Sequence, residues 1–142
     1  KCNMTDIMAA IGLVQLRRYP ALLARRYDMV RRYDAQLPQE VLRPAHLRPD
    51  MTSDCHLYLA RLPGKTHETR SAVITRMAER GVACNVHYKP LPLLTAYKNL
   101  GFRMEDYPNA YAQFENEITL PLHTLLSDED IDYVCACLKE CL

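Results

Sequence analysis

The sequence has few glycines and lacks the short motifs that mark a self-contained active site. Only four of its 142 residues are glycine, so a glycine-rich loop around a phosphate is not expected. It contains no Gly-x-Gly-x-x-Gly, no Gly-x-x-x-x-Gly-Lys-Ser/Thr, no Gly-x-Ser-x-Gly and no His-Glu-x-x-His. These absences argue against a dinucleotide fold, a P-loop enzyme, a serine hydrolase and a zinc protease. We expect no catalytic residue in this chain.

Metal ligands at a metal-binding spacing are also lacking. No two of the five histidines stand four residues apart, and none of the six cysteines forms a Cys-x-x-Cys pair. No leader sequence directs the chain to an oxidising compartment. We therefore expect no metal, reduced thiols that serve as small apolar residues, and a cytoplasmic location. The sequence does not start with methionine, which suggests that it was cut from a longer protein.

The composition is that of one soluble globular domain, with 49% apolar and 25% charged residues. No apolar run approaches the roughly 20 residues of a membrane-spanning helix, so no membrane partner is expected.

Positive and negative charges are concentrated at opposite ends of the sequence. Residues 1–50 carry nine Lys or Arg and five Asp or Glu, whereas residues 104–142 carry one and nine. This asymmetry predicts pairing of the two ends, in the fold or across a dimer, or nucleic-acid binding at the front. The basic candidates are the pairs Arg17-Arg18, Arg25-Arg26 and Arg31-Arg32. We favour a solvated helix face or a subunit contact over nucleic acid for them.

Hydrophobic periodicity and capping residues predict an α+β domain in which helices cover a small mixed or antiparallel sheet. Thr5 is a helix cap, Pro20 breaks or kinks the helix that follows, and Gly81 ends a later helix. The expected helices cover about residues 5–20, 21–37, 66–81, 109–117 and 127–142, and the expected strands residues 56–62, 82–87 and 118–120.

Several stretches, in order along nearly the whole chain, resemble one known family. They are Lys1–Leu16, His56-Leu-Tyr58, His87-Tyr-Lys-Pro-Leu-Pro-Leu93, Asp106-Tyr-Pro-Asn-Ala110, Ile118-Thr-Leu-Pro-Leu-His123 and Ser127-Asp-Glu-Asp-Ile131. Together they resemble the C-terminal small domain of DegT/DnrJ/StrS-type nucleotide-sugar aminotransferases, which depend on pyridoxal 5'-phosphate.

The resemblance implies a fold-type I transferase whose small domain is residues 1–142 and whose large domain, with the cofactor lysine, is absent. The parent enzyme would move an amino group from an amino acid to a nucleotide-linked keto-sugar, with glutamate as the expected donor. Its product would serve polysaccharide or antibiotic-sugar biosynthesis. It would act as a homodimer with shared active sites. The five lysines match no Schiff-base motif, so this chain alone should be inactive and should not hold the cofactor; they are Lys1, Lys65, Lys89, Lys98 and Lys139.

The resemblance also assigns site residues. Lys1 and Asn3 match the segment that reaches the cofactor phosphate of the neighbouring subunit, and they precede a helix N-terminus that favours an anion. The family more often has asparagine where Lys1 stands and a basic residue where Asn3 stands. His87, Tyr88 and Lys89 match the stretch that borders the sugar nucleotide, where Lys89 suits a diphosphate and the other two suit hydrogen bonds.

Three alternatives stay open at this point. Relatives within the superfamily carry histidine in place of the lysine and remove a hydroxyl from the sugar, so a sugar dehydratase is one. A DNA-binding or regulatory module built on the arginine-rich helices is the second, and it predicts affinity that falls steeply with salt. The third is a non-catalytic partner domain of a related enzyme.

Overall fold

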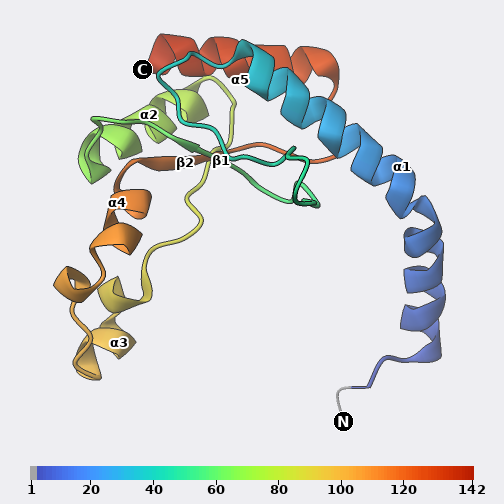
Figure 1. Cartoon of the computed structure of the whole chain (residues 1–142), viewed down its shortest axis with the longest axis horizontal. Coiled ribbons are helices and arrows are strands. Elements are labelled where there is room, and N and C mark those ends of the chain that lie inside the picture. Colours follow the sequence, from blue (N-terminus) through green and yellow to red (C-terminus); the bar gives the residue numbers. More distant parts are fainter. Residues whose placement is uncertain (1–2) are drawn as a thin grey trace.

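The computed structural model describes residues 3–142 and has the shape of an arch (Figure 1). Helices α2 and α5, the small sheet and the end of α1 form the top of the arch. The start of α1 extends downward as one arm, and α3 and α4 form the other. The elements are α1 (Asp6–Gln36), β1 (Tyr58–Arg61), α2 (His67–Glu79), α3 (Thr95–Asn99), α4 (Pro108–Asn116), β2 (Glu117–Leu120) and α5 (Asp128–Cys141), with 3-10 turns at Leu91–Leu93 and Met104–Asp106.

Helix α1 joins the two helices that the sequence predicted on either side of Pro20. The Thr5 side chain accepts a hydrogen bond from the Met8 amide at 3.3 Å, as expected of a helix cap. The helix then runs through Pro20 and changes direction along its length (Figure 1). Pro20 predicted a break or a kink, and the continuous, bent helix agrees with the kink, so only the division into two helices was wrong. The helix can tolerate the proline because the residues around it are exposed, so water can reach the carbonyl that the proline leaves without a partner.

The sheet is antiparallel and has two strands, in agreement with the predicted fold class. Tyr58 pairs with Leu120 and Arg61 with Glu117, which places β1 along one edge of β2. Along the other edge, Asn85 forms a single β-bridge with Thr119. Because it has neighbours on both edges, β2 is buried at all four positions.

The predicted strand at residues 82–87 is wrong, since only the bridge at Asn85 forms there. The next two backbone amides donate to side chains and not to backbone carbonyls of β2. The Val86 amide donates to the Asn85 side chain at 2.8 Å, and the His87 amide donates to the Glu117 carboxylate at 3.0 Å. A ladder cannot continue once its donors are occupied in this way.

The core lies between the sheet and the helices α1, α2 and α5. Tyr33 of α1 and Tyr58 of β1 stack with ring centroids 4.7 Å apart. Both hydroxyls are satisfied, Tyr33 by the Pro121 carbonyl at 2.7 Å and Tyr58 by Asp34 at 2.6 Å. Burial raises the pKa of both phenols well above their ordinary value, so they remain neutral hydrogen-bond donors.

The charged ends of the chain pair within the fold. Arg25 of α1 bonds to Asp128 of α5 at 2.6 Å, and Arg32 bonds to Asp132 at 2.5 Å. The hydrogen bonds that Asp132 accepts from Arg32 and then Gln36 lower its pKa to about 2. One of the two explanations of the charge asymmetry is thus confirmed, because arginines of the second half of α1 bind acidic residues of α5.

The cysteines among residues 3–142 are free thiols, as predicted. Cys55, Cys135, Cys137 and Cys141 are buried and Cys84 is half-buried. Burial raises the pKa of Cys84 to about 12, and that of Cys135 to about 11, so both stay protonated and behave as small apolar groups.

By length and composition alone, α1 is long and apolar enough to cross a membrane. The apolar runs in the sequence did not predict this. An 18-residue window of the helix reaches a mean hydropathy of 1.2 and is not buried. One such helix near the start of a chain is weak evidence, and α1 also contains Arg17 and Arg18.

Candidate functional site

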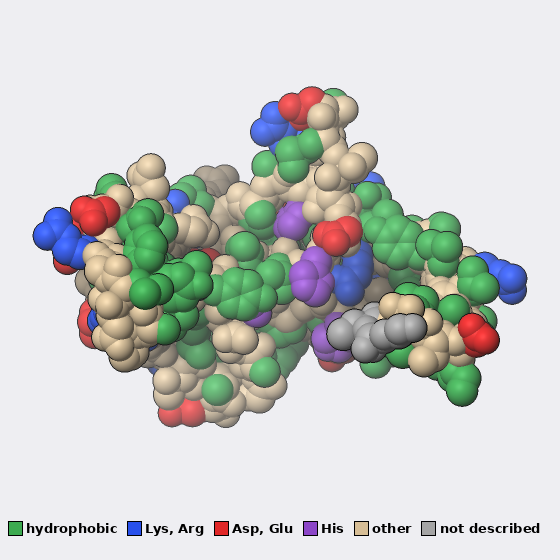
Figure 2. Space-filling view, turned by 90° about the horizontal axis from the view of Figure 1, so that it is seen from below, with side chains coloured by type: hydrophobic (Ala, Val, Ile, Leu, Met, Phe, Trp, Pro, Cys, Tyr) green, Lys and Arg blue, Asp and Glu red, His purple; other side chains and the backbone are tan. Residues whose placement is uncertain are grey.

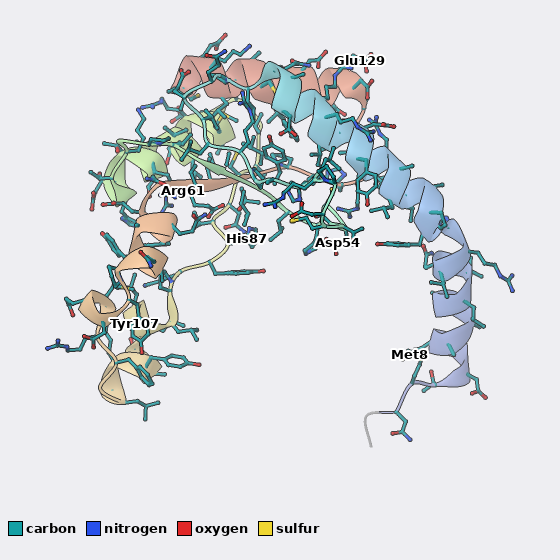
Figure 3. The ribbon with its side chains drawn as sticks, viewed as in Figure 1. Met8, Asp54, Arg61, His87, Tyr107 and Glu129 are labelled. Atoms are coloured by element: carbon teal, nitrogen blue, oxygen red, sulfur yellow. The ribbon has the colours of Figure 1, made fainter. Side chains whose placement is uncertain are left out.

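The predicted substrate residues His87, Tyr88 and Lys89 follow directly after the bridge between Asn85 and Thr119. Figure 3 labels His87 beneath the sheet, on the side from which both arms of the arch extend. The bridge fixes the backbone just before these residues. In it, Asn85 and Thr119 form two backbone N–H to carbonyl hydrogen bonds, of 3.2 and 2.8 Å. The bridge to β2 therefore holds the start of this loop in place, and binding residues are commonly found on loops held by a rigid scaffold.

His87 is the best anchored of the three. Its amide donates to the Glu117 carboxylate at 3.0 Å, and its Nδ1 lies 2.8 Å from the Thr119 hydroxyl. The Thr119 hydroxyl donates in turn to the other Glu117 oxygen at 2.6 Å. Glu117 is 1% exposed and Thr119 is 5% exposed, so His87 is bound to a buried polar network on β2.

The charge of Glu117 is opposed by a second buried ionic group, Arg70 of α2. The pKa of Arg70 is lowered by desolvation, and the negative charge of Glu117 offsets part of that effect. Arg70 also donates to the Phe114 carbonyl at 3.1 Å and stacks on the Phe114 ring at 5.2 Å.

Tyr88 and Lys89 are freer than His87. The Tyr88 side chain is 73% exposed and meets the His87 ring edge-to-face, with centroids 4.6 Å apart. Lys89 lines a shallow hollow of about 260 Å³ together with His67, at the start of α2, and Lys98 of α3. Three groups that can carry positive charge therefore line one surface depression, along with the acidic Glu68.

The predicted cofactor residues lie elsewhere. Lys1 is outside the described residues. Asn3 is exposed and precedes the N-terminus of α1 at the far end of its arm, away from the sheet (Figure 1). The structure therefore does not bring Asn3 and His87 together within one chain, and the roles assigned to these residues remain predictions.

The described lysines do not build a cofactor pocket. The Lys65 ammonium donates to the Leu142 carbonyl at 2.5 Å, Lys89 and Lys98 line an open hollow, and Lys139 is exposed on α5. A pyridoxal ring needs a reactive lysine in an enclosed site.

Several site residues were not identified from the sequence. Glu117 was predicted as the end of a helix and Thr119 as part of a strand, and no binding role was predicted for His67 or Lys98. The available signal was a charged residue inside an otherwise apolar strand, because a buried carboxylate is seldom retained without a partner.

Both arms of the arch expose apolar side chains (Figure 2). In the view from below, hydrophobic atoms cover the α1 arm and the α3–α4 lobe, and histidines lie between them. On the α1 arm these residues are Met4, Ile7, Met8, Ile11, Leu13, Val14, Leu16 and Tyr19. In the lobe, Pro90, Leu91, Pro92, Tyr97, Phe102, Tyr107 and Ala110 line an apolar hollow of about 370 Å³.

Comparison with known proteins gives one consistent result. The sequence profile described as the DegT/DnrJ/EryC1/StrS aminotransferase family matches residues 1–139. Among solved structures, the apo-form of Spr1654 from Streptococcus pneumoniae, which carries the name of a sugar aminotransferase, superposes with a TM-score of 0.96. It is 58% identical over 99% of this chain and 36% of its own. The form of that protein with pyridoxal phosphate gives a TM-score of 0.94 at 56% identity.

Two curated relatives match almost the whole chain. The spore coat polysaccharide biosynthesis protein SpsC of Bacillus subtilis is 32% identical over 99% of this chain. The GDP-perosamine synthase of Caulobacter vibrioides is also 32% identical over 99% of it. The chain spans only 37% and 38% of the length of these two relatives.

Proposed function

The chain belongs to the DegT/DnrJ/EryC1/StrS aminotransferase family, and we propose that it forms the sugar-nucleotide side of the active site in a pyridoxal-phosphate-dependent nucleotide-sugar aminotransferase. On this proposal residues 1–142 are the C-terminal small domain, and a large domain supplies the cofactor lysine. The observation that carries the proposal is the match over nearly the whole chain to Spr1654, whose structure has been solved with pyridoxal phosphate.

The names of the relatives support a nucleotide-linked sugar as substrate. One relative is named for making GDP-perosamine, an amino sugar on a nucleotide, and another for the biosynthesis of a polysaccharide. The charged hollow lined by Lys89, Lys98 and His67 has the chemistry that a diphosphate requires, since ammonium groups bind phosphate as point charges.

His87 and Tyr88 are proposed to bind the sugar beside that diphosphate. The His87 ring is held by Thr119, and no described residue bonds to its Nε2 atom, so that atom is available to a ligand. The exposed Tyr88 ring and hydroxyl provide an apolar face and a polar tip, which suits a sugar ring with its hydroxyl groups.

The cofactor, when bound, acts as the electron sink that lets an amino group leave its donor, which we propose to be glutamate. This chain is proposed to bind the cofactor only at the cofactor's phosphate group. Lys1 and Asn3, at the positive end of the α1 dipole, are proposed to contact the phosphate in the neighbouring subunit of a homodimer.

The exposed apolar arm of α1 is consistent with such a dimer. An apolar helix face of this extent is costly in water unless a partner covers it. The acidic partners of Arg25 and Arg32 weaken the DNA-binding alternative, because these arginines are occupied within the fold.

The visible spectrum of the protein made from its complete reading frame tests the proposal. With pyridoxal phosphate we expect a yellow protein whose absorbance bleaches when glutamate is added and recovers when a nucleotide-linked keto-sugar follows. A panel of sugars on guanosine, uridine and thymidine diphosphate would identify the nucleotide. Bound cofactor that shows no lysine adduct would favour the sugar dehydratase. A protein that binds no cofactor would overturn the proposal.

A further inference from the structure

A short hydrogen-bond chain joins the buried Glu117 carboxylate to the ring of His87. Glu117 accepts from the Thr119 hydroxyl at 2.6 Å and from the His87 amide at 3.0 Å. Thr119 is in turn 2.8 Å from Nδ1 of His87. All three contacts lie within normal hydrogen-bond distance, and two of the three side chains are buried.

The direction of each hydrogen bond follows from the chemistry of its groups. Both oxygens of Glu117 accept, one from the His87 amide and the other from the Thr119 hydroxyl. A hydroxyl has one proton, and Thr119 donates that proton to Glu117. The Thr119 oxygen must then accept from His87, which requires a proton on Nδ1.

We propose that Glu117 and Thr119 are positioning residues that hold neutral His87 as its Nδ1–H tautomer, so that Nε2 faces the substrate as a hydrogen-bond acceptor. The ligand group that this atom binds is a donor, such as a hydroxyl or N–H of the nucleotide sugar. The identity of that ligand rests on the function proposed above, whereas the tautomer depends only on the contacts within this chain.

The surroundings of His87 agree with this assignment. Two contacts fix the residue, one at its backbone amide and one at Nδ1, so its ring has little freedom to turn. The Tyr88 ring packs edge-to-face against it at 4.6 Å. Nε2 has no partner among residues 3–142 and is not among their buried unpaired atoms, so a ligand can approach it.

Three substitutions separate this role from a purely structural one. Thr119→Val removes the hydroxyl and keeps the side-chain shape, whereas Thr119→Ser keeps the hydroxyl. Glu117→Gln introduces an amide that can donate to Thr119, which then donates to Nδ1 and reverses the chain. Glu115→Gln removes a carboxylate only two residues away and is the matched control.

The first measurement is the ¹⁵N spectrum of the histidine rings in the protein made from its complete reading frame, with His87→Gln to assign the signals. For the wild type, with the ring neutral, we expect a protonated Nδ1 and an unprotonated Nε2. Glu117→Gln should shift the proton toward Nε2, and Thr119→Val should give a mixture. Thr119→Ser and Glu115→Gln should keep the wild-type pattern.

The second measurement is steady-state kinetics with the best nucleotide-linked keto-sugar. Thr119→Val and Glu117→Gln should raise KM for the sugar about 3- to 10-fold and change kcat less than about 2-fold, the effect of one lost hydrogen bond. Thr119→Ser should restore the wild-type KM.

The outcomes keep the two proposals apart. If the wild type shows Nε2–H, or if Glu117→Gln leaves the tautomer unchanged, the positioning role is overturned even where amino transfer is observed. If the wild type transfers no amino group, the proposed function fails while the ring spectrum still decides the tautomer. Should Glu117→Gln fail to fold, the Thr119→Val and Thr119→Ser pair carries the test.

Discussion

The two halves of α1 have similar apolar residues and opposite environments. In the second half, Met29, Val30 and Tyr33 are fully buried against the sheet and α5. In the first half, Ile7 is 76% exposed and Ile11 is 59% exposed. The helix is continuous, so this difference does not come from local structure. The second half has its partner within residues 3–142, whereas the described residues do not cover the first half.

The largest expected effect is a difference in the free energy of unfolding when a buried and an exposed isoleucine, both in helices, are replaced by alanine. Ile131→Ala in α5 removes a fully buried side chain and should lower the free energy of unfolding by about 2–5 kcal/mol. Ile11→Ala should change it by less than about 0.5 kcal/mol, because the side chain is exposed and alanine favours helix. Urea denaturation of the 142-residue chain measures both. Equal losses would mean that the α1 arm is packed in the isolated chain.

The next effect is on self-association. The apolar surface of the arm should make the isolated chain associate, and Ile7→Glu together with Ile11→Glu should make it monomeric in sedimentation. In the complete protein the same pair should weaken the dimer instead. A chain that is monomeric without the substitutions would contradict an apolar arm that needs a partner.

A smaller effect should distinguish the two helix caps. Ser127 caps α5 in a reciprocal box with Asp130, and Ser127→Ala should cost about 1 kcal/mol of global stability. Thr5 caps the exposed arm, so Thr5→Ala should increase local fraying, with almost no effect on global unfolding. Amide hydrogen exchange resolves both. A global loss from Thr5→Ala would show that the arm unfolds together with the core.

The smallest effect concerns acid stability. The pKa of Asp132 is held at about 2, below its ordinary value of 3.8, by hydrogen bonds from Arg32 and Gln36. A depressed pKa stabilises the fold above the ordinary value, and this contribution is lost as pH falls from about 3.8 to about 2. Asp132→Asn should flatten the pH dependence of unfolding in that window. Asp50→Asn is the comparison, since the pKa of Asp50 is also lowered, but by hydrogen bonds from Arg48 only two residues away in the sequence.

The sequence predicted best those elements whose signals are local. Ser127 and Thr66 mark helix starts by their capping side chains, and both helices begin where they indicated. A small mixed or antiparallel sheet that includes residues 56–62 and 118–120 was also predicted, and the observed sheet is antiparallel, with β1 shorter than predicted and β2 one residue longer. Pro20 predicted either a break or a kink, and this local signal did not decide that the helix continues and bends.

The loss of the strand at residues 82–87 and the connection of Glu117 to the site could not be predicted, because both depend on contacts between residues far apart in the sequence. The strand expected at residues 82–87 fails since Glu117, thirty residues away, takes the His87 amide. The same carboxylate is joined to the His87 ring through Thr119, and no spacing in the sequence reveals that connection. His87, Tyr88 and Lys89 were identified by resemblance, and their roles remain to be measured.

Transfer of ¹⁵N from labelled glutamate to a nucleotide sugar, followed by mass spectrometry, tests the central claim most directly. The protein from its complete reading frame, with pyridoxal phosphate and a matching keto-sugar, should yield a ¹⁵N-labelled amino sugar. His87→Ala should slow the step that uses the sugar and leave the bleaching by glutamate unchanged. An unlabelled sugar, or equal slowing of both steps, would contradict a sugar-nucleotide role for this chain.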